Sequence, residues 1–331
     1  MNAANPPTRA KRTASLSLDL DNLWSYMKTH GEAEWEDYPT YLPDFVPIAL
    51  EFLERHDQKI TFFVVGQDAV REQNHGALRQ IAEAGHEFGN HSFNHEPWMQ
   101  EYDEGRVIEE LVETHGELER ITGAAPVGFR GPGFCYSDTI LKALREMGYQ
   151  FDASVLPSIL GPIARLYYMR GANMTDEERA TRRGLFGRFT DGFLPLKPFG
   201  WRIPEGDLLE IPVTTIPVFR VPFHLSYVLW LSRYSEVLAL AYLRFGLLMC
   251  RALGVEPSYL LHPLDLLGAE DAPRLSFFPG MDIPRERKLE IAGNALGMLQ
   301  HHFDVVPMSE HARRIRERGI RRFATPKPLG G

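Results

Sequence analysis

The stretch ASLSLDLDN, residues 14–22, is a short run of small and apolar residues that ends in two aspartates. Such a run predicts a buried strand with carboxylates at its end. An amphipathic helix is expected next, over 43–58, and a second buried strand, KITFFVVG, over 59–66. A strand, a helix and another strand in this order are typical of a parallel βαβ unit.

The same alternation continues along the chain. Helices are expected at 77–85, 103–123 and 137–148, and strands at 86–92, 126–132 and 149–154. It resumes with a strand in 208–217, a helical region at 226–253, a strand at 258–262, a helix at 285–302 and a strand at 303–307. The sequence therefore predicts an α/β fold with a parallel, barrel-like sheet, whose reactive residues gather at the carboxyl ends of strands.

The alternation fails over 157–210, which is rich in Gly, Pro, Arg and aromatic residues. We interpret this segment as an inserted lid over the mouth of the barrel and not as a separate domain. The predicted organisation is a disordered tail at 1–13, one barrel domain at 14–310, and the end of a basic helix with a tail at 311–331.

Composition narrows the function. The 331 residues carry a net charge of −8, which argues against a general nucleic-acid binder. The two cysteines, Cys135 and Cys250, lack metal or redox spacing, and the first 15 residues lack the apolar core of a signal peptide. With no apolar run of transmembrane length, we expect a cytoplasmic protein.

Five polar residues fall at or just past the ends of predicted strands: Asp19, Asp21, His91, Arg130 and Asp152. In GNHSFNHEPW, residues 89–98, His91 and His95 are four residues apart. On a helix, both rings would leave the same face and could close on a metal ion. Taken alone, the pair could equally be two ordinary histidines, and a metal site would require a third ligand.

Five motifs in order carry a family resemblance: LDLDN (18–22), NHSFNH (90–95), FRGPGF (129–134), FDAS (151–154) and YLLHPLD (259–265). The series resembles carbohydrate esterase family 4, the polysaccharide deacetylases with a NodB-type domain, over roughly residues 14–310. The resemblance implies a distorted (β/α)7-type barrel. Its first motif is split as Asp-x-Asp, where most members have adjacent aspartates, and is similar to the intracellular peptidoglycan-deacetylase and allantoinase-like branch.

The resemblance also implies roles for individual residues. It makes Asp19 the general base, and Asp21, His91 and His95 the ligands of Zn²⁺ or of Co²⁺, Mn²⁺ or Ni²⁺. It makes His262 the general acid, Arg130 the partner of Asp19, and Asp152 the residue that fixes Arg130. The backbone of Gly133 would stabilise the oxyanion, and Leu260 would line an apolar pocket for the acyl methyl group. Asp265 could either begin a helix or orient His262.

The expected reaction is removal of an N-acyl group from an aminosugar, with a polyprenyl-phosphate-linked sugar as the favoured substrate. The basic and aromatic insertion suits peripheral association with the inner membrane face, as does the apolar stretch 218–253, which could equally be a core helix. The residues available for the phosphate are Arg165, Arg170, Arg182, Arg183 and Arg188. The alternatives are an N-formyl-sugar deformylase, an allantoinase-like hydrolase of small cyclic amides, a soluble-glycan deacetylase and a catalytically silent sugar-binding module.

Overall fold

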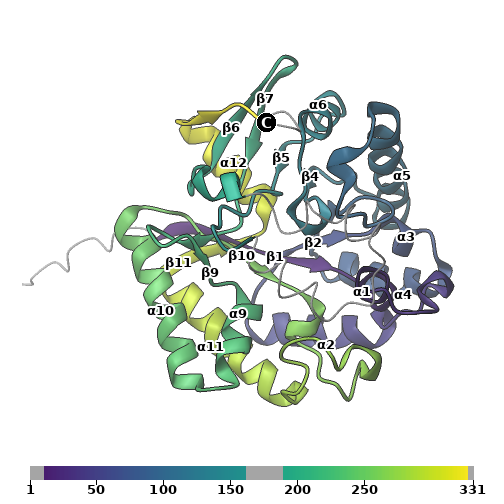
Figure 1. Ribbon diagram of the computed structural model, residues 1–331, viewed down its shortest axis with the longest axis vertical. Helices are drawn as coiled ribbons and strands as arrows, with labels where there is room; N and C mark the ends of the chain where they lie inside the picture. The colour runs from purple at the N-terminus through teal and green to yellow at the C-terminus, as the bar shows by residue number, and fades with distance from the viewer. Residues whose placement is uncertain (1–10, 162–188, 327–331) are drawn as a thin grey trace, which may run out of the picture.

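The computed structural model describes residues 11–161 and 189–326. Its central strand is β1 (Arg12–Leu20), which pairs in parallel with β10 (Ser258–Leu261) on one side. On the other side, its first half pairs with β11 (Phe303–Val306) and its second half with β2 (Thr61–Val64), both in parallel. The sheet continues in parallel through β3 (Glu87–Asn90), β4 (Gly128–Phe129), β5 (Phe151–Asp152) and β7 (Gly206–Glu210). Figure 1 shows these strands at the centre of the molecule with helices around them.

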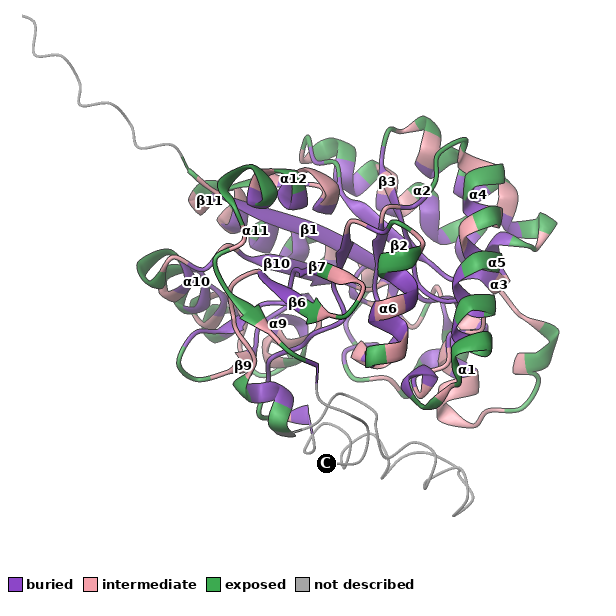
Figure 2. Cartoon of the chain, turned by 90° about the horizontal axis from the view of Figure 1, so that it is seen from above, coloured by how far each residue is buried: buried purple, intermediate pink, exposed green. Residues whose placement is uncertain are grey.

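The helices follow the strands in the predicted alternation. The main ones are α1 (Leu23–His30), α2 (Leu42–Arg55), α3 (Gly66–Ala69), α4 (Glu72–Glu83), α5 (Glu104–Thr122), α6 (Asp138–Glu146), α9 (Leu225–Ser232), α10 (Glu236–Leu253), α11 (Arg285–His302) and α12 (Met308–Arg318). Short 3₁₀ turns lie at Trp35–Asp37, Met99–Glu101, Pro132–Phe134, Phe189–Phe193, Pro263–Asp265 and Pro273–Leu275. Figure 2 shows that the exposed residues lie mainly on the outer surfaces of the helices, whereas the strands are buried.

The two faces of β1 explain how the barrel is filled. Leu16, Leu18 and Leu20 belong to the largest apolar cluster, together with side chains of α2, α10 and α11. The alternate residues, Ser17 and Asp19, contact the buried guanidinium of Arg130. Because successive side chains of a strand point to opposite faces, β1 presents apolar side chains outward and polar ones inward. Asp19 lies at the end of the polar face, where the strand stops.

Three predicted boundaries need correction. β1 begins at Arg12, so the predicted tail at 1–13 extends too far. Residues 199–203 of the predicted lid form β6 (Phe199–Ile203), antiparallel to β7, because buried Phe199 and Trp201 pack in the core and Pro204 and Glu205 make the turn between the strands. Beyond α12, β12 (Phe323–Ala324) pairs with β6, so the sheet includes residues that we assigned to the C-terminal tail.

The centre of the predicted lid, including Arg165, Arg170, Arg182, Arg183 and Arg188, lies outside the described residues. Its placement over the mouth stays a prediction.

The helical region predicted at 226–253 is two helices, because Ser235 begins a new one by accepting a hydrogen bond from the backbone N–H of Leu238. Within the described residues, no helix has both the length and the apolar character needed to cross a membrane.

Candidate metal and catalytic site

Asp21, His91 and His95 converge just past the carboxyl ends of β1 and β3. One potential ligand atom from each lies within 4.8 Å of the other two, and all three residues are buried. Asp21 Oδ1 is 3.0 Å from Nε2 of His95 and 3.4 Å from Nε2 of His91. Two imidazoles and one carboxylate are donors that zinc and related ions accept, and three protein ligands leave positions for water and substrate. The structure brings together the three residues implied as ligands.

The protonation of these residues fits a divalent cation. Burial raises the pKa of Asp21, but His95 and His91 outweigh burial and hold that pKa well below its ordinary value, so the side chain is a carboxylate. Its buried Oδ1 accepts no hydrogen bond of good geometry from any described residue. Nδ1 of His91 lies 2.6 Å from the carbonyl oxygen of Arg130. We assign the ring proton to Nδ1, which leaves Nε2 as a free donor atom for a metal.

The two histidines lie in a loop and not on one turn of a helix. Ser92 and His95 have positive φ angles of 61° and 52°, a conformation that side chains adopt only where contacts impose it. Glu110 of α5 supplies such contacts, because its Oε2 accepts the backbone N–H groups of Phe93 and Asn94, each at 2.8 Å. Sequence reasoning missed Glu110, which lies among many other surface-type carboxylates in its helix.

Asp19 and Arg130 form a buried ion pair next to the three potential ligands. The guanidinium Nη1 donates to Asp19 Oδ1 at 2.6 Å and to Ser17 Oγ at 2.9 Å. Nε donates to the carbonyl oxygen of Ala153 at 3.0 Å, and the group lies 4.3 Å from the centre of the Phe63 ring. These contacts hold the guanidinium in place beside the Asp19 carboxylate. Arg130 therefore lies where the prediction places it.

The prediction that Asp152 fixes Arg130 is wrong. Asp152 Oδ1 instead accepts hydrogen bonds from the backbone N–H groups of Ala153 and Ser154 and from the Ser154 hydroxyl. The register explains the error. Asp152 pairs with Phe129 on β4 and with Glu210 on β7, so its side chain shares their face of the sheet, whereas Arg130 is one residue further and points to the other face.

Asp152 instead supports the turn that carries Gly133. The Ser154 hydroxyl, which donates to Asp152, accepts the backbone N–H of Gly131 at 2.8 Å. A Cβ at Gly131 would lie 2.0 Å from the carbonyl oxygen of Cys135, and Gly133 has a φ of 60°. The turn therefore needs glycine at both positions. Burial and the neighbouring Asp152 raise the pKa of Glu210 well above its usual value. One carboxyl group of this pair is therefore protonated and the other is ionised.

Leu260 lies fully buried in β10, in a small apolar cluster with Leu156 and Val213. Phe134, from the turn that holds Gly133, packs against the same cluster. An apolar group next to a backbone turn is what an acyl methyl pocket requires. The structure places the turn that holds Gly133 against the Leu260 cluster through Phe134, while contact of either residue with a substrate remains a prediction.

His262 follows β10 directly and is partly buried. Its backbone N–H donates to Oδ2 of Asp265 at 2.8 Å, and its Nδ1 is 3.8 Å from the same oxygen. Burial lowers the pKa of His262, but Asp265, Asp19 and Asp21 outweigh burial and raise it to about 9. Asp265 thus fills both roles left open by the sequence, since it also belongs to the 3₁₀ turn Pro263–Asp265. The imidazolium form available at neutral pH can donate a proton.

Two further residues near His262 come from α9, and sequence reasoning missed both. Ser226 Oγ is 3.2 Å from Nδ1 of His262. The ring centre of buried His224, at the N-cap of α9, is 5.9 Å from that of His262. Burial and the neighbouring His262 lower the pKa of His224 to about 3, so it is neutral. No local signal distinguishes these residues, because only the packing of α9 beside β10 brings them to the site.

The loop after β1 is fixed by a buried carboxylate. Asp68 Oδ1 accepts hydrogen bonds from Asn22 Nδ2 at 2.7 Å and from Trp24 Nε1 at 2.9 Å. Asn22 in turn caps α1 through the backbone N–H of Leu23. Burial raises the pKa of Asp68 to about 7. Asn22 and Trp24, undecided from sequence, therefore fix the backbone directly after Asp21 through Asp68 and are not potential ligands.

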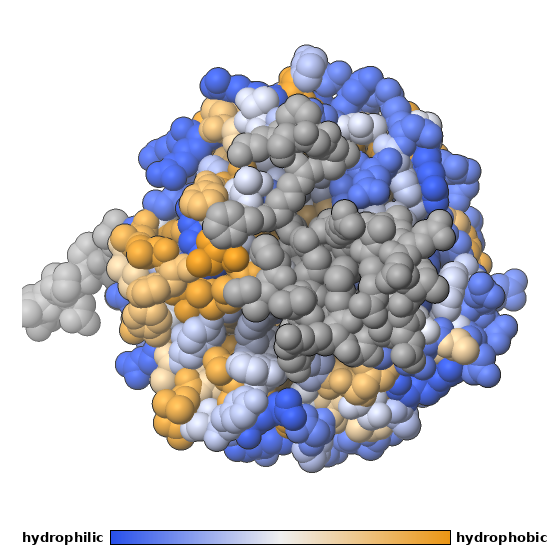
Figure 3. All heavy atoms as spheres, viewed as in Figure 1, coloured by the Kyte–Doolittle hydropathy of each residue, from blue (hydrophilic) through white to orange (hydrophobic). Residues whose placement is uncertain are grey.

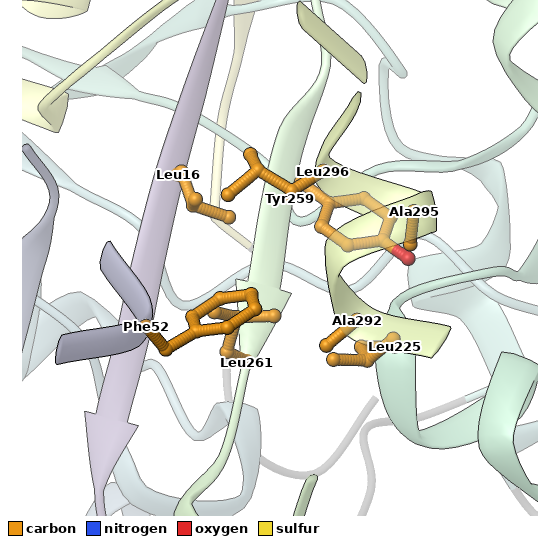
Figure 4. A pocket seen from close by; sticks show the side chains of 8 residues that line it. All are labelled: Leu16, Phe52, Leu225, Tyr259, Leu261, Ala292, Ala295 and Leu296. Atoms are coloured by element: carbon orange, nitrogen blue, oxygen red, sulfur yellow. The ribbon is translucent and has the colours of Figure 1, made fainter. Parts of the chain in front are cut away.

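An apolar cavity lies elsewhere in the molecule. Figure 4 shows it between β1, β10 and the helices α2, α9 and α11, lined by Leu16, Phe52, Leu225, Tyr259, Leu261, Ala292, Ala295 and Leu296. None of these residues belongs to the candidate site. We interpret the cavity as a packing gap in the core, with Tyr259 as its only polar side chain among those eight.

A sequence profile of the polysaccharide deacetylase family matches residues 33–151. A peptidoglycan-N-acetylglucosamine deacetylase of Bacillus cereus is 32% identical over 107 residues, which are 32% of this chain and 37% of that protein. The uncharacterized protein YlxY of Bacillus subtilis is 36% identical over 110 residues, 33% of this chain and 32% of that protein. The chain thus matches about a third of the length of these relatives.

Solved structures extend the likeness of the fold over almost the whole chain. A crystal structure from Mycobacterium smegmatis, assigned to the polysaccharide deacetylases, covers 98% of this chain and 97% of its own, with a TM-score of 0.64 and 20% identity. The PuuE allantoinase covers 94% of this chain and 93% of its own, with a TM-score of 0.56 and 18% identity. The predicted fold class is confirmed. The resemblance drawn from the five motifs is confirmed as well, since residues 33–151 match the polysaccharide deacetylase family and the similar proteins include peptidoglycan deacetylases.

Proposed function

We propose that this chain is a metal-dependent hydrolase that removes the N-acetyl group from an aminosugar. The observation that carries the proposal is the convergence of Asp21, His91 and His95 beside the Asp19–Arg130 ion pair. Zinc is the proposed ion, because two Nε2 atoms and a carboxylate suit it best among the divalent ions considered. When bound, such an ion supplies Lewis acidity toward the amide carbonyl and toward water.

The protein residues divide the proton transfers between them. Asp19, ionised and oriented by Arg130, would accept the proton of the attacking water. His262, held in its charged form by Asp265, would donate a proton to the departing amine. One carboxylate kept charged and one imidazole kept protonated are the base and acid that amide hydrolysis needs at neutral pH.

The remaining predicted residues would hold the substrate. The turn around Gly133 would direct a backbone N–H at the developing oxyanion, and the Asp152–Ser154–Gly131 chain of hydrogen bonds would keep that turn rigid. The cluster of Leu260, Leu156 and Val213 would receive the acetyl methyl group. A small apolar pocket next to an oxyanion donor would favour a short acyl chain over a long one.

For the physiological substrate we propose an N-acetyl-hexosamine on a polyprenyl phosphate, met at the inner face of the cytoplasmic membrane. The names of the relatives support an N-acetylated wall sugar, since one acts on peptidoglycan N-acetylglucosamine and another, PdaA of Bacillus subtilis, on peptidoglycan N-acetylmuramic acid. The lipid carrier is supported by the exposed apolar side chains of α9 and α10 and by the basic, aromatic composition of the predicted lid.

The decisive experiment compares turnover of one N-acetyl-hexosamine as the free sugar, as a nucleotide sugar and as a polyprenyl-phosphate sugar. We expect the lipid-linked form to react fastest, with acetate released. The Asp19→Asn variant should keep its metal, measured by elemental analysis, and lose roughly 10²–10⁴ in rate, as expected for one positioned proton-transfer group. Loss of metal in this variant would make Asp19 a ligand instead. Hydrolysis of an N-formyl sugar or of allantoin, without release of acetate, would contradict the deacetylase proposal.

A further inference from the structure

The outer face of helix α10 is apolar although it is exposed. Val237 is 78% exposed, Leu238 68%, Phe245 44% and Leu248 41%, and Ala241 lies exposed between them. The spacing of three and four residues places them along one side of the helix. The opposite side, with Ala239, Leu243, Leu247 and Cys250, is buried in the core. A helix that is apolar on both sides usually has a second apolar environment to bury its outer face.

Aromatic and apolar side chains extend this face at both edges. Trp230 of α9 and Tyr234, just after this helix, lie edge to face with ring centres 5.5 Å apart, and both are exposed. Val218 and Phe219 form the exposed turn between β8 (Thr215–Ile216) and β9 (Val221–Pro222), and Phe219 lies 5.8 Å from the Phe245 ring. Figure 3 shows hydrophobic residues gathered over α10 and this turn, at the left of the view. We call this set the α10 surface.

Cations collect around the C-terminal end of the same helix, although the chain as a whole has a net charge of −8. The Arg12 guanidinium donates to the carbonyl oxygen of Arg251 at 2.6 Å, and Lys11 to that of Gln300 at 2.7 Å. Burial, followed by the neighbouring Arg322 and Arg12, lowers the pKa of Lys197, which shows that these charges lie within each other's field. The group comprises Lys11, Arg12, Lys197, Arg244, Arg251 and Arg322.

These cations lack counterions. Among the described residues, no ion pair joins any of the six to a carboxylate. The carboxylates that lie near them, Glu256 and Asp304, are already paired with Arg318 and Arg314. By contrast, Arg233 and Arg287, near the other end of the helix, pair with Asp282 and Glu236. The uncompensated positive charge is therefore a local feature of one end of α10.

We propose that the α10 surface docks on an anionic lipid bilayer, with the apolar side chains in the headgroup layer and the six cations on lipid phosphates. An apolar helix face combined with cations is what interfacial binding requires, and Trp and Tyr side chains favour that depth. A second copy of the chain fits less well, because it would add another set of unpaired cations, whereas anionic headgroups neutralise them. The inference deepens the proposed function and rests on it only for the identity of the lipid-borne substrate.

The position of the surface relative to the site supports this use. Helix α9 links the two, because Ser226 at its start contacts His262 while Trp230 and Tyr234 lie exposed at its end. A bilayer docked along α10 would therefore reach from the cations, at the end where β1 begins, to the α9 end of the surface nearer the site. A sugar whose lipid tail remains in the bilayer could reach the candidate site with its headgroup alone.

Vesicle flotation tests the proposal with the whole protein. We expect binding at low salt to vesicles of phosphatidylcholine mixed with phosphatidylglycerol, and much weaker binding to phosphatidylcholine alone. Phe245→Ser with Leu248→Ser should abolish binding. Ile108→Ser with Val112→Ser, a matched pair of exposed apolar residues on α5, should leave it unchanged. Arg244→Gln with Arg251→Gln should weaken binding roughly 10- to 30-fold, at about a factor of five for each cation near an anionic surface.

Three results would overturn the proposal. The first is wild-type protein that floats with neither vesicle at low salt. The second is equal binding by the α10 and α5 variants. The third is a wild-type dimer that the α10 variant converts to a monomer in light scattering, which would assign the surface to a second copy. Turnover of a water-soluble N-acetyl-hexosamine should be the same in the wild type and the α10 variant. A failure of the membrane proposal can then be told apart from a failure of the proposed chemistry.

Discussion

The segment from Arg12 to Val155 and the segment from Phe199 to His262 bring residues to the same mouth in different ways. In the first, every strand except β2 leads to a polar residue of the predicted site, and neighbouring strands follow each other in the chain. In the second, a hairpin, two helices and a strand intervene, and Ser226 and His262 meet only through packing of α9 on β10. The first segment holds the potential ligands and base, and the second holds the acid.

The comparison predicts that metal binding depends on the first segment alone. His91→Ala should remove the metal and reduce turnover to background, which is the largest effect expected of any single change, because one of three ligands is lost. Elemental analysis of protein purified without chelators measures the metal. His301→Ala, which removes an exposed histidine outside the site, is the control and should retain both metal and activity. Equal metal in the two variants would reject the assignment of the ligands.

The second segment should instead set the alkaline limit of activity. Because the pKa of His262 is raised to about 9, its charged form persists up to about that pH. The interaction of this charge with Asp265 therefore stabilises the fold fully below about pH 6.5 and is lost as the pH rises through about 9. Asp265→Asn removes the largest raising influence while it keeps a hydrogen-bond acceptor. The His262 titration, followed by NMR in metal-free protein, should therefore move to lower pH, and the rate at pH 8 should fall about tenfold.

An unchanged His262 titration in Asp265→Asn would show that Asp19 and Asp21 alone keep the His262 ring protonated. That result would weaken the comparison, because the acid would then depend on the first segment as well. Metal content should stay the same in this variant, and a loss of metal would indicate a wider disturbance of the site.

The smallest expected effect comes from α9. Ser226→Ala removes one hydrogen-bonding partner of His262 Nδ1 and should lower kcat roughly 2- to 10-fold, the range for one neutral hydrogen bond. Ser232→Ala, on the same helix but bonded only to the carbonyl oxygen of Leu229, should leave kcat unchanged. Equal rates for both variants would show that α9 packs against the acid without positioning it.

The sequence predicted most of the first segment because its signals are local. The strand ends at Asp19, His91 and Arg130 follow apolar runs directly, and the order of five motifs indicated the family. Contacts between distant segments gave no such signal. Glu110 looks like any other helix carboxylate until the fold brings it to the loop at 93–95, and His224 depends on where α9 begins.

The error at Asp152 has the same origin. The sequence placed Asp152 and Arg130 at the ends of adjacent strands, and both are there. Which face each side chain uses depends on a register of one residue, and that register follows from pairing between β4, β5 and β7. The partner of Asp152 on β7, Glu210, lies across a segment where strand and helix no longer alternate. A sequence motif can identify the residues of a site, but the direction of each side chain in the pleated sheet determines which residues it contacts.

The burial of Arg130 also has a consequence for how the chain is made. Its guanidinium contacts Ser17 and Asp19 near the start of the chain and the sulfur of Met308 near the end. β1, synthesised first, has β10 along one side, and β2 and β11 share its other side. During synthesis the first strand must therefore remain unpaired on one side until β10 is made, when about four fifths of the protein exists. Such long-range pairing slows folding, and a nascent chain in this state would have both aspartates in place but no finished site around them.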